Sequence, residues 1–152
     1  MDIVSYLKKQ KVKFKRMKHP ERFTSQEVAA AQHVPGREMV KAVLVKADKE
    51  FVLAVLSAIC KVNFDRLAKV LGVKKVKLAG EKDMARLFPD VEVGAEPPFG
   101  NLYDVQTVVD ESLTEEEEIV FQAGTHKDTV KMKYADYEKL VNPKVGQFGD
   151  HL

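Results

Sequence analysis

The chain has 152 residues, 45% of them hydrophobic and 32% charged, and a formal net charge of +2 at pH 7. This length and apolar content fit one compact domain with a sizeable core and exclude a mainly disordered chain. The single cysteine, Cys60, excludes an internal disulfide and a CxxC pair, and the four histidines show no HxxxH spacing. We therefore expect neither a metal centre nor a cofactor.

No apolar stretch reaches the roughly 18 to 20 residues of a membrane span. The N-terminal sequence MDIVSYLKKQ carries its basic residues after a short apolar patch, which is the reverse of a secretory signal peptide. These features predict a cytoplasmic protein with no membrane partner.

Basic residues gather in two segments, within residues 8–18 and 61–82, whereas acidic residues gather within residues 110–118. If the fold brings the basic segments together, they present one basic face that can meet a phosphate backbone. The alternative is an ordinary solvated surface on which both charges are interspersed. Charge alone does not choose between the two.

In chain order, the first predicted element is a helix near residues 3–7, whose apolar residues have helical spacing. Residues 12–15 alternate apolar and basic side chains, which is typical of an edge strand with one solvent-exposed face. The sequence TSQE at residues 24–27 resembles a capping box and predicts a short helix that Pro35 and Gly36 end.

Two apolar runs, residues 39–47 and 51–58, predict a β-hairpin. The second run, FVLAVLSA, is apolar on both faces apart from Ser57, which is typical of a strand in the middle of a covered sheet. A helix follows, with Asn63 as its N-cap and Gly72 as its C-cap.

The second half of the chain predicts shorter elements. VKKVKLA is a strand with Val73 or Val76 and Leu78 pointing inward, and EKDMARLF is a helix that ends at Pro89. Residues 91–93 predict a short strand, and a Gly/Pro loop and a strand over residues 105–109 follow it. EIVFQAG and TVKMK predict two more strands and ADYEKLV a helix, and residues 142–152 are expected to form a poorly ordered tail.

These helices and strands follow one another without a regular βαβ pattern. We therefore predict an α+β fold, in which surrounding helices cover a mixed, largely antiparallel sheet. In this prediction residues 1–141 form a single domain, and residues 142–152 form the tail outside it.

Lys41 interrupts the first run of the hairpin, because both faces of this strand are otherwise apolar. Two interpretations stay open. In the first, the lysine lies near the strand end and extends its ammonium to water along an apolar stem. In the second, it lies at the mouth of a cleft and binds a phosphate, hydroxyl or carbonyl oxygen of a ligand, which offsets the cost of its burial.

Two glycine-bearing loops are candidates for the rest of such a cleft. In GAEPPFG, residues 94–100, two prolines stiffen the turn and Gly100 permits a close backbone approach to a ligand. In FQAGTHKD, Gly124 places backbone N–H groups beside Thr125 and His126, which makes a candidate oxyanion site. An ordinary tight connection and a surface histidine are the alternatives, although an imidazole also permits proton transfer.

The stretches TSQEVAAAQHVPGREMVKAVLVKAD, FVLAVLSA, NFDRLAKVLGVKKVKLA, GAEPPFGNLYDVQTVVDESL and FQAGTHKDTVKMKYADYEKLV, in this order, resemble the YbaK/ProX family of free-standing aminoacyl-tRNA deacylases. That family is related to the editing domain inserted in bacterial prolyl-tRNA synthetases, and the resemblance spans residues 1–141. It implies a trans-editing enzyme that hydrolyses the ester between a small, wrongly attached amino acid and the terminal adenosine of tRNA.

The resemblance also implies the residues of the site. The essential lysine of the family corresponds to Lys41, which would orient the terminal nucleotide as the catalytic residue. The GxxxP loop that shapes the acyl pocket corresponds to residues 94–98. Backbone N–H groups near Gly100 or Gly124 would stabilise the oxyanion while water or the ribose hydroxyl attacks, with no metal and no nucleophilic triad. The substrate-binding residues would be Met39, Ser57, Gly94, Pro98, Phe99, Gly100, Gly124, Thr125 and His126.

The implied partners are mischarged tRNA, held by the basic segments through phosphate neutralisation, and an aminoacyl-tRNA synthetase. Two other interpretations stay open. One is a non-catalytic module of the same fold that binds tRNA or a synthetase, and the other is an interaction protein that has only a shallow cleft at Lys41.

The acyl pocket is expected to be small and largely apolar. Met39 and Val43 would line it from the strand of Lys41, and alternate residues of the second strand, ending at Ser57, would complete it. Such a pocket excludes bulky side chains but separates alanine from serine or cysteine by only about 1–3 kcal/mol. Some family members that remove alanine have a histidine where this chain has Gln122, so alanine, cysteine, serine and proline all stay open.

Overall fold

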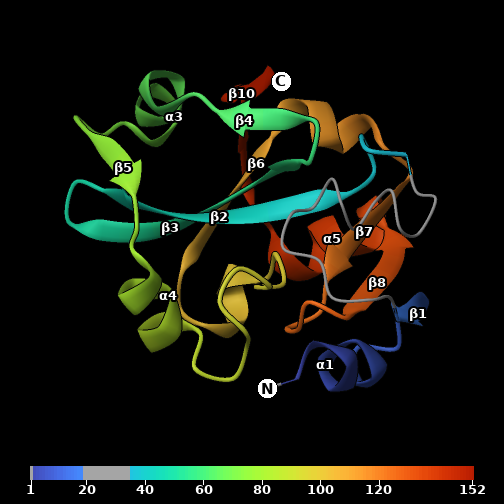
Figure 1. Cartoon of the computed structure of the whole chain (residues 1–152). Helices are drawn as coiled ribbons and strands as arrows, with labels where there is room; N and C mark the ends of the chain where they lie inside the picture. Colours follow the sequence, from blue (N-terminus) through green and yellow to red (C-terminus); the bar gives the residue numbers. More distant parts are fainter. Residues whose placement is uncertain (1, 19–34) are drawn as a thin grey trace.

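The computed structural model of the protein describes residues 2–18 and 35–152, which form a five-stranded sheet, a three-stranded sheet, a two-stranded pair and surrounding helices (Figure 1). The predicted α+β class with mixed, largely antiparallel pairing is confirmed. The helix predicted from residues 24–27 onward lies outside the described residues. None of the helices in the described part of the chain is long and apolar enough to cross a membrane.

The five-stranded sheet has the order β5-β2-β3-β6-β9. Its strands are β2 (Val40–Ala47), β3 (Glu50–Ser57), β5 (Val76–Leu78), β6 (Gln106–Asp110) and β9 (Lys144–Gly146). The β2–β3 and β2–β5 pairs are antiparallel, whereas β3–β6 and β6–β9 are parallel. The apolar run FVLAVLSA thus forms the central strand, as its two apolar faces predicted.

The three-stranded sheet has the order β1-β8-β7 and is antiparallel throughout. Its strands are β1 (Phe14–Lys18), β7 (Glu118–Gln122) and β8 (Asp128–Lys133). The prediction of a basic edge strand in this part of the chain is confirmed. An isolated parallel bridge between Met39 and Val120 joins the two sheets, so the start of β2 lies beside β7.

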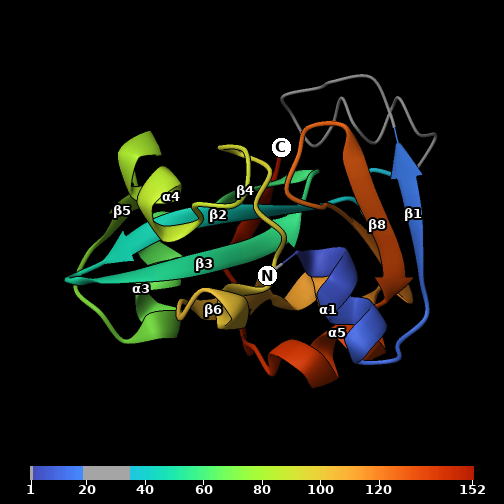
Figure 2. The same ribbon diagram turned by 90° about the horizontal axis from the view of Figure 1, so that it is seen from below.

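The described α-helices are α1 (Ile3–Lys9), α3 (Phe64–Leu71), α4 (Glu81–Leu87) and α5 (Tyr134–Val141), and the 3-10 helices are η1 (Gly100–Leu102) and η2 (Glu111–Glu115). Both predicted caps of α3 are confirmed. The Asn63 side chain accepts a hydrogen bond from the backbone N–H of Arg66, and Gly72 has the left-handed conformation with φ 69°. The helices α3 and α4 lie on opposite sides of the β2–β3 hairpin (Figure 2).

Two hydrophobic cores cover the two faces of the hairpin. Leu44 and Leu53 belong to the larger core, which also receives side chains from α1, α5 and the three-stranded sheet. Val45 and Ala54 belong to the smaller core under α3. Because successive residues of a strand point to opposite faces, Lys41 lies on the same face of β2 as Val45.

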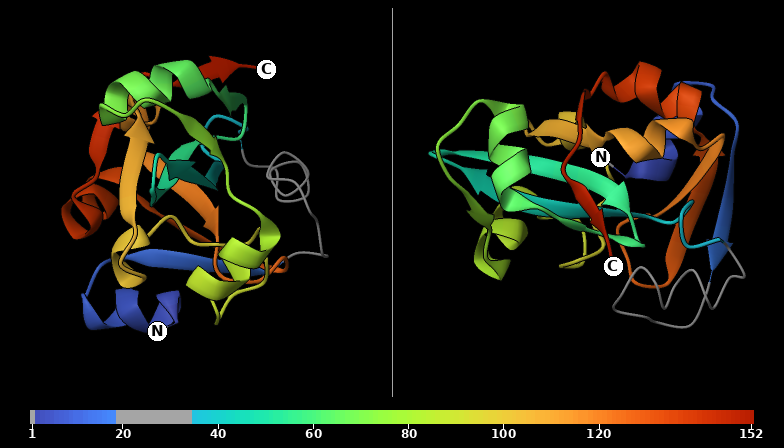
Figure 3. Two further views of the ribbon diagram at one scale, coloured as in Figure 1. Left: turned by 90° about the vertical axis from the view of Figure 1, so that its left-hand side faces the viewer. Right: turned by 90° about the horizontal axis from the view of Figure 1, so that it is seen from above.

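The last residues of the chain are part of the fold, so the prediction of a poorly ordered tail over residues 142–152 is wrong. After α5 the chain forms β9 beside β6 and then β10 (Gly149–His151) beside β4 (Cys60–Val62), as the right-hand view of Figure 3 shows. Phe148, between the two strands, is fully buried in the core under α3.

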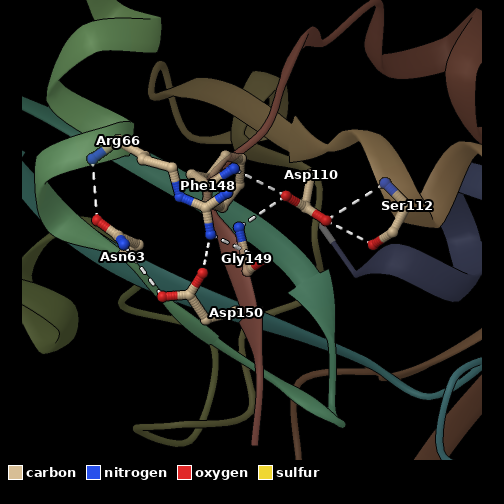
Figure 4. Close-up of polar contacts among 7 residues, drawn as sticks. All are labelled: Asn63, Arg66, Asp110, Ser112, Phe148, Gly149 and Asp150. Carbon is tan, nitrogen blue, oxygen red and sulfur yellow. Dashed lines mark hydrogen bonds and ion pairs between the residues drawn. The ribbon is translucent and has the colours of Figure 1, made fainter.

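The buried carboxylate of Asp110 anchors this tail (Figure 4). Its Oδ1 accepts hydrogen bonds from the backbone N–H groups of Phe148 and Gly149, at 2.9 and 2.7 Å. Its Oδ2 accepts from the N–H and the hydroxyl of Ser112. One side chain thus satisfies four donors at the point where the tail meets the sheet.

Two smaller predictions are also wrong. Residues 91–93 form no strand. Leu78 does not point inward but is 60% exposed, because β5 is a three-residue edge strand at whose last residue the chain leaves the sheet.

The two basic segments lie at opposite ends of the molecule. The first forms α1 and β1, and the second forms α3, β5 and the start of α4, far from β1 in both views (Figures 1 and 2). The expectation of a single basic face built from both segments is therefore wrong, and each segment has to be considered separately.

Candidate functional site around Lys41

The register of the three-stranded sheet aligns side chains from distant parts of the sequence. Met17 pairs with Thr129, and Thr129 pairs with Gln122, so these three residues form one row across β1, β8 and β7. Their side chains point away from the larger core, since Phe121 and Val130, which alternate with them, point into it.

A second row lies beside the first on the same face. Lys15 pairs with Lys131, Lys131 pairs with Val120, and Val120 bridges to Met39 at the start of β2. Lys41 lies two residues after Met39, and Gln122 lies two residues after Val120. Because the bridge is parallel and alternate residues of a strand share a face, the side chains of Lys41 and Gln122 point to the same side as Met39 and Val120. We call this side of the strands the Lys41 face; its members are Lys15, Met17, Met39, Lys41, Val120, Gln122, Thr129 and Lys131. Four of them, Met39, Val120, Gln122 and Thr129, are buried.

Lys41 is half-buried on β2. Burial lowers the pKa of its ammonium from the ordinary value, and the nearby Cys60 counteracts part of that effect. Burial raises the pKa of the Cys60 thiol, the charge of Asp110 raises it further, and Lys41 opposes both. Cys60 is therefore held as a neutral thiol, and Lys41 is a partly dehydrated cation that gains from an anionic or polar ligand.

The two glycine-bearing loops contact each other. Gly124 donates its N–H to the carbonyl of Ala95 at 3.0 Å, and its own carbonyl accepts from the N–H of Glu92 at 2.8 Å. Gly94 and Gly124 both have positive φ values, 89° and 92°, which only glycine adopts without strain. Since the second loop begins at Gln122, it continues directly from the Lys41 face.

His126 fastens one loop to the other. Its ring Nε2 donates to the carbonyl of Val93 at 2.9 Å, and its backbone N–H donates to a carboxylate oxygen of Glu92 at 3.1 Å. With 6% of its surface exposed it is buried, so the alternative of a surface histidine is wrong.

A buried carboxyl group lies next to this histidine. Burial raises the pKa of Glu96, while a hydrogen bond from the N–H of Gly94, at 3.0 Å, and the proximity of His126 act in the opposite direction. Thr125 closes the other loop, because its hydroxyl donates to Asp128 at 2.7 Å. The residues of the two loops thus hold a fixed backbone shape.

The predicted oxyanion donors are already engaged. The N–H of Gly100 donates to the hydroxyl of Thr107 at 3.1 Å, and the N–H of Gly124 donates to Ala95. A Cβ at Gly100 would lie only 2.4 Å from the carbonyl oxygen of Val105, so this glycine serves a close backbone crossing. The N–H groups of Gly100 and Gly124 themselves are therefore engaged within the protein, and stabilisation of an oxyanion by other backbone N–H groups near these glycines stays a prediction.

Pro98 and Phe99 belong to the interior. The carbonyl of Pro98 accepts from the hydroxyl of Tyr137 at 2.6 Å. The fully buried ring of Phe99 packs edge-on against Phe121 and Tyr137, with ring centroids 5.5 and 5.1 Å apart. These contacts fix the loop that starts at Gly94 and leave Phe99 as a core residue.

Ser57 lies on the opposite face from Lys41. The register of the hairpin pairs Ser57 with Val40 and pairs Lys41 with Leu56, and directly opposed residues share a face. The Ser57 hydroxyl donates to the carbonyl of Gly36 at 3.2 Å. The prediction that Ser57 and alternate β3 residues line a pocket with Lys41 is wrong, because it took no account of this register.

Ser57 instead lines a pocket of about 580 Å³, together with Cys60, Asp110 and residues of η2 and β10. Among the residues that the structure describes, no group of three or more His, Cys, Asp and Glu side chains is placed to hold a metal ion.

Two residues near the site, Thr129 and Cys60, carry no signal in the sequence that would select them. Thr129 is 1% exposed and lies between Met17 and Gln122 only through strand pairing, and Cys60 reaches Lys41 through the turn after β3. The register of the three-stranded sheet identifies Thr129, and local sequence patterns do not determine that register.

Comparison with known proteins places the chain in a family. The model of the aminoacyl-tRNA editing domain matches residues 19–140, well over half of the chain. The multifunctional Ser/Thr-tRNA deacylase ProXp-y of Escherichia coli (strain K12) is 33% identical over 100 residues, which cover 65% of this chain and 59% of that protein. The chain thus matches less than two thirds of that relative's length.

Two further proteins are similar. The proline–tRNA ligase of Bacillus cytotoxicus is 27% identical over 94 residues, which are 62% of this chain and 16% of the ligase. A crystal structure described provisionally as a trans-editing enzyme for prolyl tRNA synthetase superposes with a TM-score of 0.85 at 18% identity, over 97% of this chain and 94% of that one. The last match concerns the fold alone. On the extent of the family-model match, the protein belongs to the aminoacyl-tRNA editing domain family.

Proposed function

We propose that the protein is a trans-editing aminoacyl-tRNA deacylase, which hydrolyses the ester of a small, wrongly attached amino acid on tRNA. The observation that carries this proposal is the position of Lys41. Its ammonium is half-buried, its pKa is lowered, and its side chain points to the same side as Gln122. The chain that carries this lysine belongs to the editing-domain family. The name of the similar ProXp-y protein supports the reaction class.

In the proposed reaction Lys41 donates hydrogen bonds to the phosphate or a ribose oxygen of the terminal nucleotide and orients the ester. Water attacks the ester carbonyl, and the neighbouring ribose hydroxyl would hold that water in place. The bond between the carbonyl carbon and the ribose oxygen breaks, a proton of the attacking water passes to the ribose oxygen, and the amino acid leaves with a free carboxyl group. The loop from Gly94 to Pro98, held by His126 and Tyr137, shapes the acyl pocket.

A deacylation panel tests the proposal. We expect release of alanine, serine, threonine, cysteine or proline from tRNA, and no release of phenylalanine or tyrosine, because a small pocket excludes large side chains by clash. We expect the rates to be unchanged by a metal chelator. Efficient release of an aromatic amino acid contradicts the small acyl pocket, and binding of tRNA without turnover of any ester identifies a non-catalytic module instead.

The tRNA body is proposed to bind at the basic end that adjoins the Lys41 face. Lys15 lies directly opposite Lys131 on that face, and Lys131 also forms an ion pair with Glu118 at 3.7 Å, so a tRNA phosphate would pair with Lys15 and compete with Glu118 for Lys131. The second basic segment lies at the far end of β2, where Ala47 pairs with Val76. The similarity to a proline–tRNA ligase supports a synthetase as a further partner.

Salt dependence separates the two basic ends. Replacing Lys15 and Lys131 by alanine should weaken tRNA binding and reduce the slope of log affinity against log salt by about one for each phosphate that is no longer neutralised. The matched control replaces Lys74 and Lys75, which are exposed beyond the other end of β2 and should leave the slope unchanged. An equal effect of both double variants would contradict the proposed orientation of the tRNA.

A further inference from the structure

One backbone peptide, the unit that joins Val93 to Gly94, is held by a side chain at each of its two polar groups. The carbonyl of Val93 accepts a hydrogen bond from Nε2 of His126 at 2.9 Å, and the N–H of Gly94 donates to Oε1 of Glu96 at 3.0 Å. Both side chains are buried, with 6% of His126 and 5% of Glu96 exposed. Two buried polar side chains therefore fix the orientation of this peptide.

The same peptide is the central one of a β-turn. The N–H of Ala95 donates to the carbonyl of Glu92 at 3.0 Å, and Gly94, the third residue of this turn, has φ 89°. A positive φ at the third residue is typical of a type II turn, and a type I turn over the same residues has its central peptide reversed. Because glycine adopts both conformations without strain, the contacts of His126 and Glu96 stabilise one of two accessible orientations.

The carboxyl group of Glu96 carries a cost for the fold. Burial raises its pKa, while hydrogen bonds from the N–H groups of Gly94 and of Glu96 itself, and the nearby His126, act in the opposite direction. Burial also raises the pKa of Tyr103, and Asp90 and the charge of Glu96 raise it further. An apolar side chain of similar size would avoid this cost, and buried carboxyl groups of shifted pKa gather at functional sites.

We propose that Glu96 is a positioning residue for ester hydrolysis, which holds the Val93–Gly94 peptide in one orientation so that the loop presents a fixed wall to the acyl group. This inference rests on the proposed deacylase function. Gly94 is exposed, whereas residues 95–100 are buried, so the carboxylate acts on the loop from the interior and not by contact with the substrate. Without the carboxylate the peptide occupies both orientations, and the bound ester is correctly placed for only part of the time.

The test compares Glu96→Ala and Glu96→Gln on one mischarged tRNA that the wild type deacylates. In Glu96→Ala, kcat should fall by about tenfold to a hundredfold. The KM should stay nearly unchanged, because phosphate contacts at other residues hold the tRNA body. Glu96→Gln keeps an oxygen that accepts from Gly94 and should restore most of kcat at neutral pH. The matched control is Glu81→Ala, at an exposed position in the first turn of α4, which should change neither constant.

The pH profile distinguishes this role from general support of the fold. A protonated Glu96 is a weaker acceptor for Gly94 and is no longer attracted to a charged His126. Because burial raises the pKa of Glu96, kcat of the wild type should fall on the acid side at a higher pH than an ordinary glutamate predicts. Glu96→Gln should lack this fall, although it keeps the neighbouring His126, Glu92 and Asp90.

Two readouts do not depend on turnover. Hydrogen exchange at the Gly94 amide should be faster in Glu96→Ala than in the wild type, and as slow in Glu96→Gln as in the wild type. The native protein binds the proton of Glu96 more tightly than the unfolded chain does. The free energy of unfolding of the wild type should therefore fall as pH rises between the two pKa values, relative to that of Glu96→Gln.

Several results would overturn the inference. One is an unchanged or increased kcat in a folded Glu96→Ala variant, since the carboxylate then does not position the ester. Another is an acid-side fall in Glu96→Gln as large and at the same pH as in the wild type, and a third is unchanged exchange at Gly94 in Glu96→Ala. If the wild type releases no amino acid from any tRNA, the proposed function itself fails, which is distinct from normal turnover that ignores Glu96.

Discussion

Replacing Lys41 by alanine should abolish deacylation while the protein stays folded. Removal of a desolvated charged group from a binding site costs about 2–5 kcal/mol, which corresponds to a fall in kcat/KM of roughly 30-fold to several thousandfold. The free energy of unfolding should not decrease, because burial already disfavours the charged form of Lys41. The test compares the turnover of a seryl ester by the wild type and by Lys41→Ala, and the circular dichroism spectrum shows whether the variant is folded.

The control for this variant is Lys46→Ala on the same strand. Lys46 is also half-buried, but it lies near the other end of β2, with its ammonium 5.6 Å from the ring centroid of Phe51. We expect normal turnover from it. Near-normal turnover in a folded Lys41→Ala variant would remove Lys41 from the mechanism.

The pH dependence follows from the lowered pKa of Lys41. The native protein loses this proton at a lower pH than an unfolded chain does, so kcat/KM should fall on the alkaline side earlier than an ordinary lysine predicts. Between the two pKa values the unfolded state binds more protons, so the stability of the wild type relative to Lys41→Ala should rise with pH.

Replacing Asp110 by alanine should destabilise the protein by about 3 kcal/mol or more, because the donors of Phe148, Gly149 and Ser112 lose their acceptor in a buried place. Urea unfolding measures the loss. Hydrogen exchange should at the same time show reduced protection of β9 and β10.

The neighbouring Glu111→Ala variant is the control for Asp110. Glu111 is exposed, so its removal should change the free energy of unfolding by no more than about 0.5 kcal/mol. If Asp110→Ala unfolds at the same urea concentration as the wild type, the carboxylate does not anchor the tail.

The parts of the fold that depend on neighbouring residues could be predicted from the sequence. Asn63 and Gly72 are caps whose preference is local, and the apolar runs of the hairpin are long enough to mark a covered strand. The tail could not be predicted, because its few apolar residues, Val145, Phe148 and Leu152, show no periodicity, and only Phe148 is buried. What orders it is a carboxylate at Asp110, far away in the sequence.

The candidate site was predictable only in part, for the same reason. Lys41 was detectable because a charge in an apolar strand violates the local pattern. Ser57 lies on the face opposite Lys41, which the sequence does not reveal because alternation within a strand does not determine how two strands are aligned. Thr129 joins this face only because β8 pairs with both β1 and β7, and no local pattern in the sequence predicts that pairing.

The pairing of β1 with β8 joins the beginning of the chain to a segment near its end. Contacts between residues so distant in sequence carry a large loop-closure entropy and form late and slowly during folding. The hairpin β2–β3 can form early, with Lys41 already in position, but the row of Met17, Thr129 and Gln122 cannot exist before this last closure. In a refolding reaction, secondary structure should therefore recover well before the ability to hydrolyse an aminoacyl ester.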